Sequence, residues 1–565
     1  MSPPRIRDAG DAAVLIEWPA VIDAGVNARA VAVAEALRAA RTPGVRDVVA
    51  TFRSVAVYLD PLVIDRAELS KTIDRALVAP VLVARGNTVE VPVMYGGPDG
   101  RDLEAVASWA GLTEADVVAR HAEAAYRVFM LGFLPGFAYL GLVDDAIAVP
   151  RLDTPRVHVP AGSVGVAGRQ TGVYPMASPG GWRLIGRTAA RLFDPRRWPS
   201  ALLKQGDTVR FVPVSAHAAG SNVDAPADDA ARRGVFGPTA ADPARAVTVL
   251  QAGPHLTVQD LGREGHQRDG VSVAGAMDTV SHRIANAVVG NDERAATLEV
   301  ALGGTALRVE SAAVVAIVGG DLGATIDHQP VSLRTPIACR PGSVLRFGGR
   351  GAEAVGARAY VSFDGGVDAP SVLGSRATHV RSGLGGFGGR PLRAGERVPL
   401  GTRDGAGVRA GTWRGGHSPH HFESPLRIPP GGARVRVIAG PQDDWFVPNA
   451  LDVLESTRFT IAGASDRMGY RLTGGHALVR RDAGEMISDA TFVGAVQVPP
   501  SGDPIVLMAD RPVTGGYPQI ATVITADLPV VAQLGPGQWI EFERCSRGEA
   551  LAALAAQEAA IRAIG

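Results

Sequence analysis

The hydrophobic pattern of residues 1–85 alternates between strand-like and helix-like segments. Largely apolar segments at 12–17 and 45–58 predict β-strands. Apolar residues spaced three and four positions apart predict helices over 28–41 and 65–77. This mixture indicates a small α+β domain at the N-terminal end of the sequence.

A second pattern follows, in which strands become more frequent than helices. A strand is predicted over 88–94, and helices are predicted over 102–111 and 113–124. Thr113, with an acid three residues later, indicates a capping box at the start of the second helix. From 129 to 213 short apolar runs alternate with Gly and Pro turns, which is typical of a β-rich domain.

Composition marks the remaining boundaries. Residues 215–245 are rich in Ala, Asp, Gly and Pro and nearly free of large apolar side chains, as expected of a linker. A new strand is predicted from Ala246 and a helix over 278–289, and a weaker boundary lies near 402–430. The expected units are 1–85, 86–214, 246–430 and 431–545, with a C-terminal helix over 546–565.

Three segments recur in the same order on either side of the linker. They are VPAG (159–162), TGVYP (171–175) and GDTVRF (206–211), and then VPPSG (498–502), TGGYP (514–518) and GQWIEF (537–542). The shared order predicts two related β-barrels of the same strand topology. Chance similarity between Gly- and Pro-rich strands is the alternative interpretation.

Composition excludes several classes of protein. The chain has 57 basic and 57 acidic residues, so nothing suggests a nucleic-acid partner. Its 69 Gly and 40 Pro favour short strands joined by turns. Two cysteines cannot build a disulfide framework, and no apolar run approaches the about 18 residues of a membrane span. The first residues do not resemble a signal peptide, and we expect a cytoplasmic protein with no membrane partner.

The sequence contains only absent or partial matches to short motifs whose chemistry is well known. The sequence contains no P-loop, and the GxGxxG pattern at 383–388 is not followed by a predicted helix. Ser163 lacks the first glycine of a nucleophile elbow. His417, His420 and His421 lie in a Gly-rich stretch without a nearby carboxylate or thiolate, so a solvated loop is favoured over a metal site.

Three longer stretches are better candidates for a site. GFLPGFAYL (132–140) places aromatic residues around a Pro-Gly turn, either as plain core or as a wall beside a ligand. The Gly-rich stretch at 158–187 could present backbone N–H groups to an anion. The stretch at 464–525 holds two Asp-Arg pairs, which are either surface ion pairs or parts of one site.

These stretches resemble a known family. Residues 1–215 are similar to allophanate hydrolase subunit 1, or the Kip sensor-kinase inhibitor, through GFLPGFAYL, VPAGSVGVAGRQTGVYP and SPGGWRLIGRT. Residues 246–545 are similar to allophanate hydrolase subunit 2, or the Kip antagonist, through TVQDLGREGHQRDGV, SDRMGYRL and GAVQVPPSGDPIVLMADRPVTGGYP. The resemblance implies a fusion of the B-type and C-type subunits of 5-oxoprolinase. It also implies a mainly β and α+β protein, with cyclophilin-like β-barrel domains beside the small N-terminal domain.

The family implies three possible roles. The pair of regions forms an ATP-dependent 5-oxoprolinase with a separate A-type subunit, forms the carboxyltransferase part of urea carboxylase, or regulates a sensor histidine kinase. The sequence contains no Met-Lys pair of the kind that a biotin carrier needs, which counts against the carboxyltransferase role. A permanent fusion of inhibitor and antagonist would weaken a regulatory switch, which counts against the kinase role. Two halves that build one site gain from fusion through effective concentration. We therefore expect 5-oxoprolinase activity, with 5-oxoproline as substrate, an A-type subunit as partner, and possible homo-oligomers.

The resemblance also implies chemistry for particular residues. ATP, with Mg²⁺, would phosphorylate the lactam oxygen before hydrolysis, which asks for positioning and charge stabilisation. Arg467 or Arg511 would hold the substrate carboxylate, and Asp466 or Asp510 would bind metal or the lactam N–H. The candidate catalytic residues are Asp466, Arg467 and Asp510, and the candidate substrate-binding residues are Gly162, Ser163, Gln170, Thr171, Tyr174, Arg511, Thr514 and Tyr517. We expect a common cavity with Asp466 and Arg467 on one wall and Thr171 and Tyr174 on the other.

Overall fold

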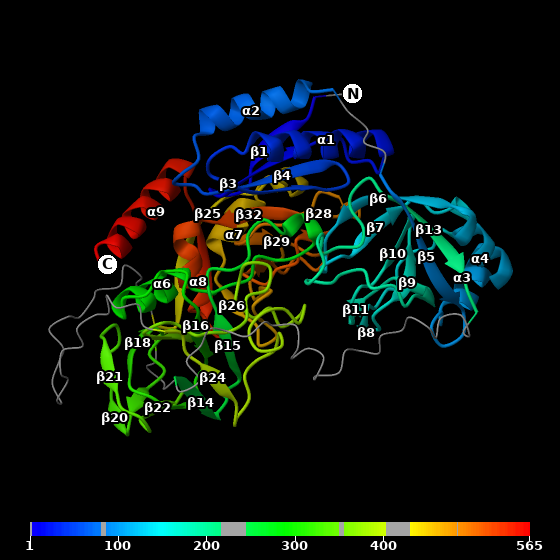
Figure 1. The fold of residues 1–565 in the computed structure, drawn as a ribbon. Helices are drawn as coiled ribbons and strands as arrows, with labels where there is room; N and C mark the ends of the chain where they lie inside the picture. Colours follow the sequence, from blue (N-terminus) through cyan, green and yellow to red (C-terminus); the bar gives the residue numbers. More distant parts are fainter. Residues whose placement is uncertain are drawn as a thin grey trace.

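A computed structural model describes six segments of the chain (Figure 1). They are residues 3–80, 86–215, 245–349, 355–402, 430–482 and 484–564. The expected linker lies almost entirely outside the described residues, as do His417, His420 and His421. No described helix combines the length and apolar character needed to cross a membrane.

The N-terminal domain is a four-stranded antiparallel sheet of order β1-β2-β4-β3, covered on one face by two helices. Its elements are β1 (Arg5–Asp8), β2 (Ala13–Glu17), α1 (Ala24–Ala40), β3 (Val45–Ala50), β4 (Ser54–Leu59) and α2 (Arg66–Val78). The single strand predicted over 45–58 is wrong, because the chain reverses at Thr51 and forms two paired strands. Both strands are buried along most of their length, and Thr51, Arg53 and Ser54 at the reversal are buried as well, so no exposed polar turn marks it.

The next region closes into a seven-stranded barrel, as predicted from the strand-rich pattern. Its strands are β5 (Thr88–Tyr95), β6 (Ala125–Leu131), β7 (Ala138–Gly141), β9 (Ser163–Ala167), β10 (Gln170–Val173), β12 (Arg183–Arg187) and β13 (Thr208–Pro213). The short strands β8 (Arg156–Val159) and β11 (Ser178–Gly180) pair beside it, and α3 (Leu103–Ala110) and α4 (Glu114–Glu123) follow β5. The predicted capping box of α4 is confirmed at Thr113 and Asp116.

The middle region, 245–402, packs a six-stranded sheet against a five-stranded sheet around one apolar core. The first sheet has β14 (Ala246–Gln251), β17 (Thr305–Val309), β19 (Ala324–Ile326), β20 (Gln329–Pro330), β22 (Val344–Phe347) and β24 (Arg397–Pro399). The second has β15 (His255–Gln259), β16 (Thr297–Ala301), β18 (Ala313–Gly319), β21 (Ile337–Cys339) and β23 (Arg358–Phe363). The predicted helix near 278–289 is confirmed as α6 (Thr279–Val288), which packs against β18 and β23.

A second seven-stranded barrel follows. Its strands are β25 (Gly432–Ala439), β26 (Phe459–Ile461), β27 (Gly469–Thr473), β29 (Ala495–Gln497), β30 (Ile505–Leu507), β32 (Gln519–Val523) and β33 (Trp539–Arg544). Beside the barrel lie the strand pair β28 (Asp489–Ala490) and β31 (Thr514–Gly515), and the helices α7 (Ala450–Ser456), α8 (Leu528–Ala532) and α9 (Arg547–Arg562).

The two barrels have the same strand order. Around the first the order is β5-β12-β9-β10-β7-β6-β13, and around the second it is β25-β32-β29-β30-β27-β26-β33. In each barrel the first and last strands pair in parallel and all other pairs are antiparallel. The prediction of two related barrels of one topology is therefore confirmed.

The sequence repeat that led to this prediction is aligned correctly only in its last segment, where β13 and β33 are equivalent. Thr171 lies in barrel strand β10, whereas Thr514 lies in β31, whose equivalent is β11. The VP segments likewise precede β9 in one barrel and follow β29 in the other. Short Gly- and Pro-rich turns recur at several places in such barrels, so these two matches are the chance similarity that was the alternative.

The N-terminal domain packs against the second barrel, at the other end of the sequence (Figure 1). The sheet face opposite its helices, including Leu15 and Tyr58, shares a buried cluster with Phe492 and Val513. The Tyr58 hydroxyl donates to the carbonyl of Thr491 at 2.9 Å. Both faces of the sheet are thus buried, and the two halves of the chain share a core.

Candidate functional site

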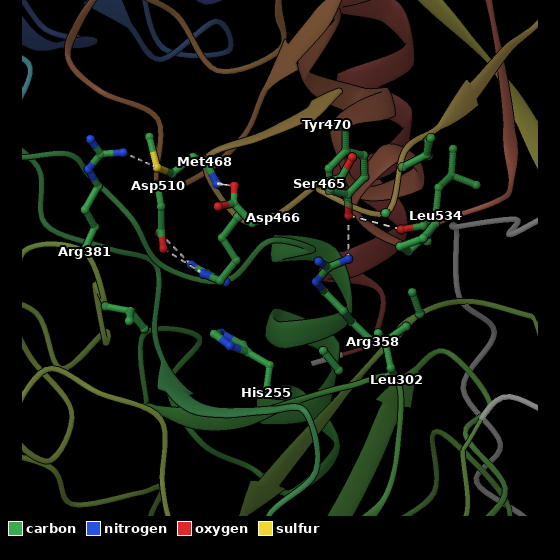
Figure 2. A pocket seen from close by; sticks show the side chains of 18 of the residues that line it. His255, Leu302, Arg358, Arg381, Ser465, Asp466, Met468, Tyr470, Asp510 and Leu534 are labelled. Carbon is green, nitrogen blue, oxygen red and sulfur yellow. Dashed lines mark hydrogen bonds and ion pairs between the residues drawn. The ribbon is translucent and has the colours of Figure 1, made fainter. Parts of the chain in front are cut away.

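A cavity of about 510 Å³ lies where the first barrel, the middle region and the second barrel meet. A volume of this size suits a small organic molecule. Figure 2 shows side chains from the loop between β26 and β27 on one side and from β15 and β23 on another. The first half of the chain contributes Ala177, Ser178 and Pro179.

Arg467 is the centre of a buried ion network behind this cavity. Its Nε and Nη2 donate to both oxygens of Asp510, at 3.0 and 2.9 Å, and its Nη1 donates to Glu299 at 2.7 Å. Nη2 also donates to the carbonyl of Gly275. Arg467 is 6% exposed, and its guanidinium has one N–H left, so it cannot hold a substrate carboxylate bidentately in this arrangement.

Glu299 carries the second negative charge of the network, and no sequence pattern pointed to it. It is fully buried on β16, and its Oε2 accepts from the hydroxyl of Tyr360 at 2.7 Å. Burial alone would raise the pKa of Glu299, but the guanidinium groups of Arg467 and Arg358 lower it to about 2. The carboxylate is therefore ionised and fixes Arg467 from behind.

Arg358 forms another wall of the cavity. Its Nη1 donates to the hydroxyl of Tyr470 at 2.6 Å and to the carbonyl of Ala532. Its guanidinium lies 5.8 Å from the Tyr470 ring centre (Figure 2), and its Nε is 3.8 Å from Glu299. Nη1 of Arg358 is thus committed to contacts within the protein, whereas its Nε has an ion pair but no hydrogen bond among the described residues.

Arg381 differs from these two arginines. Its Nη1 lies 2.8 Å from the thioether sulfur of Met468, and its guanidinium lies 5.4 Å from the ring centre of Phe133 in the first barrel. Its Nε is buried without a hydrogen-bond partner, and among the described residues Arg381 forms no ion pair. Burial lowers the pKa of Arg381, and nearby Asp466 opposes this shift.

Besides the Nε atoms of Arg381 and Arg358, two polar atoms of the cavity lining are buried and lack hydrogen-bond partners among the described residues: Ser178 Oγ and His255 Nε2. Burial lowers the pKa of His255, which favours the neutral ring. A polar ligand atom or water would satisfy both groups.

Asp466 is exposed at the rim of the cavity. Its Oδ1 accepts from the backbone N–H groups of Met468 and Gly469, at 2.8 and 3.3 Å, which fixes the turn between β26 and β27. Its other oxygen has no hydrogen bond within the described residues and is available to a ligand.

The expected wall of Thr171 and Tyr174 is wrong. Thr171 is fully buried in the first barrel, where its hydroxyl bonds the carbonyl of Gly165 at 3.0 Å and the ring of His121 at 2.8 Å. Tyr174 is 2% exposed, in a cluster with Phe137 and Trp182. Thr171 lies on strand β10, whereas Tyr174 follows that strand and packs in a separate buried cluster, so neither side chain reaches the cavity.

The other candidates from the first barrel lie outside the lining of the cavity as well. Ser163 is buried, and Gly162, at φ +81°, hydrogen-bonds through its backbone to Tyr174 and Thr188. Gln170 is half-buried, with an Oε1 that lacks a partner among the described residues. None of the three side chains borders the cavity.

Three candidates from the second half also lie elsewhere. Arg511 is buried between the two halves, with its Nη2 2.7 Å from Gln267 Oε1 and its guanidinium 5.7 Å from the Tyr58 ring centre. Thr514 is buried against the first barrel near Gly132, and Tyr517 is 42% exposed. These residues belong to the interface between the halves or to the surface.

The residues that line the cavity do not fit a triphosphate. In the part of the chain that the structure describes, no three His, Cys, Asp or Glu side chains gather closely enough to hold a metal ion. A triphosphate needs several available cations, but Arg467 and Arg358 both pair with Glu299, and of the described arginines in the lining Arg381 alone forms no ion pair.

Comparisons with known proteins agree with this division into two halves. The model of the carboxyltransferase domain, subdomains C and D, matches residues 4–203, and that of subdomains A and B matches residues 269–544. Both halves of the chain thus have the architecture of carboxyltransferase-type domains.

Relatives of each half are known separately. The C-type subunit of 5-oxoprolinase from Escherichia coli is 36% identical over 310 residues, which cover 54% of this chain and 93% of the relative. The B-type subunit of 5-oxoprolinase from Bacillus subtilis is 38% identical over 223 residues, which cover 37% of this chain and 93% of the relative. The crystal structure of TTHA0988 matches with a TM-score of 0.81 at 34% identity, covering 95% of this chain and all of that one.

The chain belongs to the carboxyltransferase-domain family of the B-type and C-type 5-oxoprolinase subunits, with a B-type half followed by a C-type half.

Proposed function

We propose that this chain is the combined B-type and C-type component of an ATP-dependent 5-oxoprolinase, which opens 5-oxo-L-proline to L-glutamate together with a separate A-type subunit. The observation that carries the proposal is the cavity at the junction of the two halves, which neither half encloses alone. The names of the relatives of each half support it.

In this proposal the chain binds and orients the lactam. 5-Oxoproline carries one carboxylate and one stabilised amide, and the cavity offers an unpaired cation, an available carboxylate oxygen and two unpartnered polar atoms among its described residues. Arg467, Asp510 and Glu299 hold the wall that presents these groups. Since the cavity lining does not fit a triphosphate, we assign ATP and Mg²⁺ to the A-type subunit and derive no step through them.

An ADP-release assay tests the proposal directly. We expect 5-oxoproline to stimulate ADP release only when this chain and the A-type subunit are both present. An A-type subunit that turns over at the same rate alone, or no release from the pair, would contradict it.

The Asp466→Asn variant tests whether the charge of Asp466 is needed in this assay. Asn keeps the carbonyl oxygen that accepts from Met468 and Gly469, so the turn is preserved while the charge is lost. We expect ADP release to fall by about tenfold or more with an unchanged melting temperature, as for the loss of one charge-assisted hydrogen bond. Asp321→Asn, in a similar turn outside the cavity, is the matched control and should be silent.

A second candidate function is transfer of a carboxyl group, which the description of the matching domain models favours. It would require a carboxylated biotin carrier supplied by another protein. Transfer of labelled carboxyl groups from such a carrier, without 5-oxoproline-dependent ADP release, would favour this function over the first.

A further inference from the structure

Arg381 is held by two loops that occupy equivalent places in the two barrels. The loop between β6 and β7 brings the Phe133 ring to 5.4 Å, and the loop between β26 and β27 brings the Met468 sulfur to 2.8 Å. Arg381 itself comes from a loop of the middle region. The pseudo-equivalent loops therefore converge on one cation.

Neither contact neutralises that cation. A thioether is a weak acceptor, and an aromatic face attracts a guanidinium without cancelling its charge. Asp466 acts on this charge only from beyond ion-pair distance, and a partly desolvated charge without a direct ion pair is costly, so an anion that enters the cavity gains by pairing with it. Arg467, which shares the cavity, already has two carboxylates.

Phe133 is held in place by its backbone. Its φ is +63°, in the left-handed region that residues with a side chain rarely adopt. The neighbouring residues are locked to the middle region, because the Gly136 N–H donates to the carbonyl of Asp269 at 2.8 Å. The loop that carries the ring is thus anchored to the middle region, from which Arg381 comes.

We propose that Arg381 is the receptor for the carboxylate of a small cyclic monoanion in the cavity, and that Phe133 is the residue that positions it across the boundary between the halves. Ser178 Oγ and His255 Nε2 are then the groups that hydrogen-bond the polar ring atoms of the same ligand. Only the identification of this anion as 5-oxoproline rests on the proposed function.

Isothermal titration of the full chain with three probes tests this inference. The probes are 5-oxoproline, 2-pyrrolidinone, which lacks the carboxylate, and cyclopentanecarboxylate, which lacks the amide. We expect the wild type to bind both carboxylates, with 5-oxoproline the tighter of the two, and 2-pyrrolidinone at least about tenfold more weakly than 5-oxoproline.

Arg381→Gln should weaken 5-oxoproline and cyclopentanecarboxylate by about 10- to 100-fold and leave 2-pyrrolidinone unchanged. Arg381→Lys should recover part of the loss, because lysine keeps the charge without the planar fork. Phe133→Leu should weaken both carboxylates about two- to fivefold. Arg458→Gln is the matched control, since Arg458 also stacks on an aromatic ring, at 4.4 Å from Trp539, but lies outside the cavity.

The outcomes separate the two proposals. Equal binding of 5-oxoproline by wild type and Arg381→Gln would overturn the receptor and leave the proposed function standing. Arg381-dependent binding of cyclopentanecarboxylate without binding of 5-oxoproline would support the receptor and count against the proposed function. A wild type that binds neither carboxylate would overturn the inference. Circular dichroism and melting of each variant check that the fold is retained.

Discussion

The two barrels share one strand order but bury different kinds of polar group. In the first, Tyr95 and His121 are joined at 2.7 Å, and His121 and Thr171 at 2.8 Å, so a neutral chain closes inside the protein. In the second, Arg467 joins Asp510 of the same barrel and Glu299 of the middle region as ions beside a cavity. The shared strand order therefore decides neither which kind of polar group a barrel buries nor whether that group faces a ligand.

The electrostatics of the two networks differ accordingly. Burial lowers the pKa of His121 to about 3, because no charge compensates the desolvation of an imidazolium there. The pKa of Glu299 is also lowered, but by the cations beside it. One network excludes charge, and the other depends on it.

The largest expected effect comes from breaking the charged network. Arg467→Ala leaves Asp510 and Glu299 buried without their shared cation, and we expect a loss of about 3–5 kcal/mol in the free energy of unfolding. Chemical denaturation measures it. A loss below about 1 kcal/mol would show that the network is not the structural centre of the second barrel.

A smaller effect is expected from the neutral network. His121→Ala leaves the hydroxyl of Tyr95 and that of Thr171 short of a partner, which we expect to cost about 1–3 kcal/mol. Because the network does not reach the cavity, ligand affinity per folded molecule should be unchanged. A large loss of affinity at unchanged stability would give the first barrel a role in the site that its geometry does not suggest.

The pH dependence of stability separates the two networks. The folded pKa of His121 lies below the unfolded value of 6.5, so its contribution is complete above pH 6.5 and is lost as pH falls toward 3. For Glu299 the contribution is complete above pH 4.5 and is lost as pH falls toward 2. We expect His121→Gln to flatten the unfolding free energy from pH 6.5 down to about 3, and Glu299→Gln to flatten it only below pH 4.5.

The smallest effect is expected from cutting the connection between the barrels. A protease site inserted within 216–244 should allow cleavage without separation, because Tyr58 and Leu15 share a core with the second barrel. Size-exclusion chromatography should show one complex of both fragments. Elution as two species would mean that the covalent link maintains the interface.

The sequence predicted elements correctly where the interactions that form them involve residues close together in the chain. The capping box at Thr113 needs only residues within one turn, and the last barrel strand was matched because its alternating pattern is continuous. Glu299 was missed, because its partner Arg467 is 168 residues away. Arg381 was missed for a similar reason, since its Gly-rich surroundings resemble an ordinary loop until Phe133 and Met468 meet it in space.

The docking of the N-terminal domain on the second barrel has a consequence for synthesis on the ribosome. Tyr58 and its acceptor Thr491 lie 433 residues apart. At roughly 5–20 residues per second, roughly 20–90 seconds pass between the emergence of the two. During that interval the apolar face around Leu15 is not covered by its own chain. A nascent-chain chaperone, or an early-folded partner molecule, can bind this defined surface until the second barrel is complete.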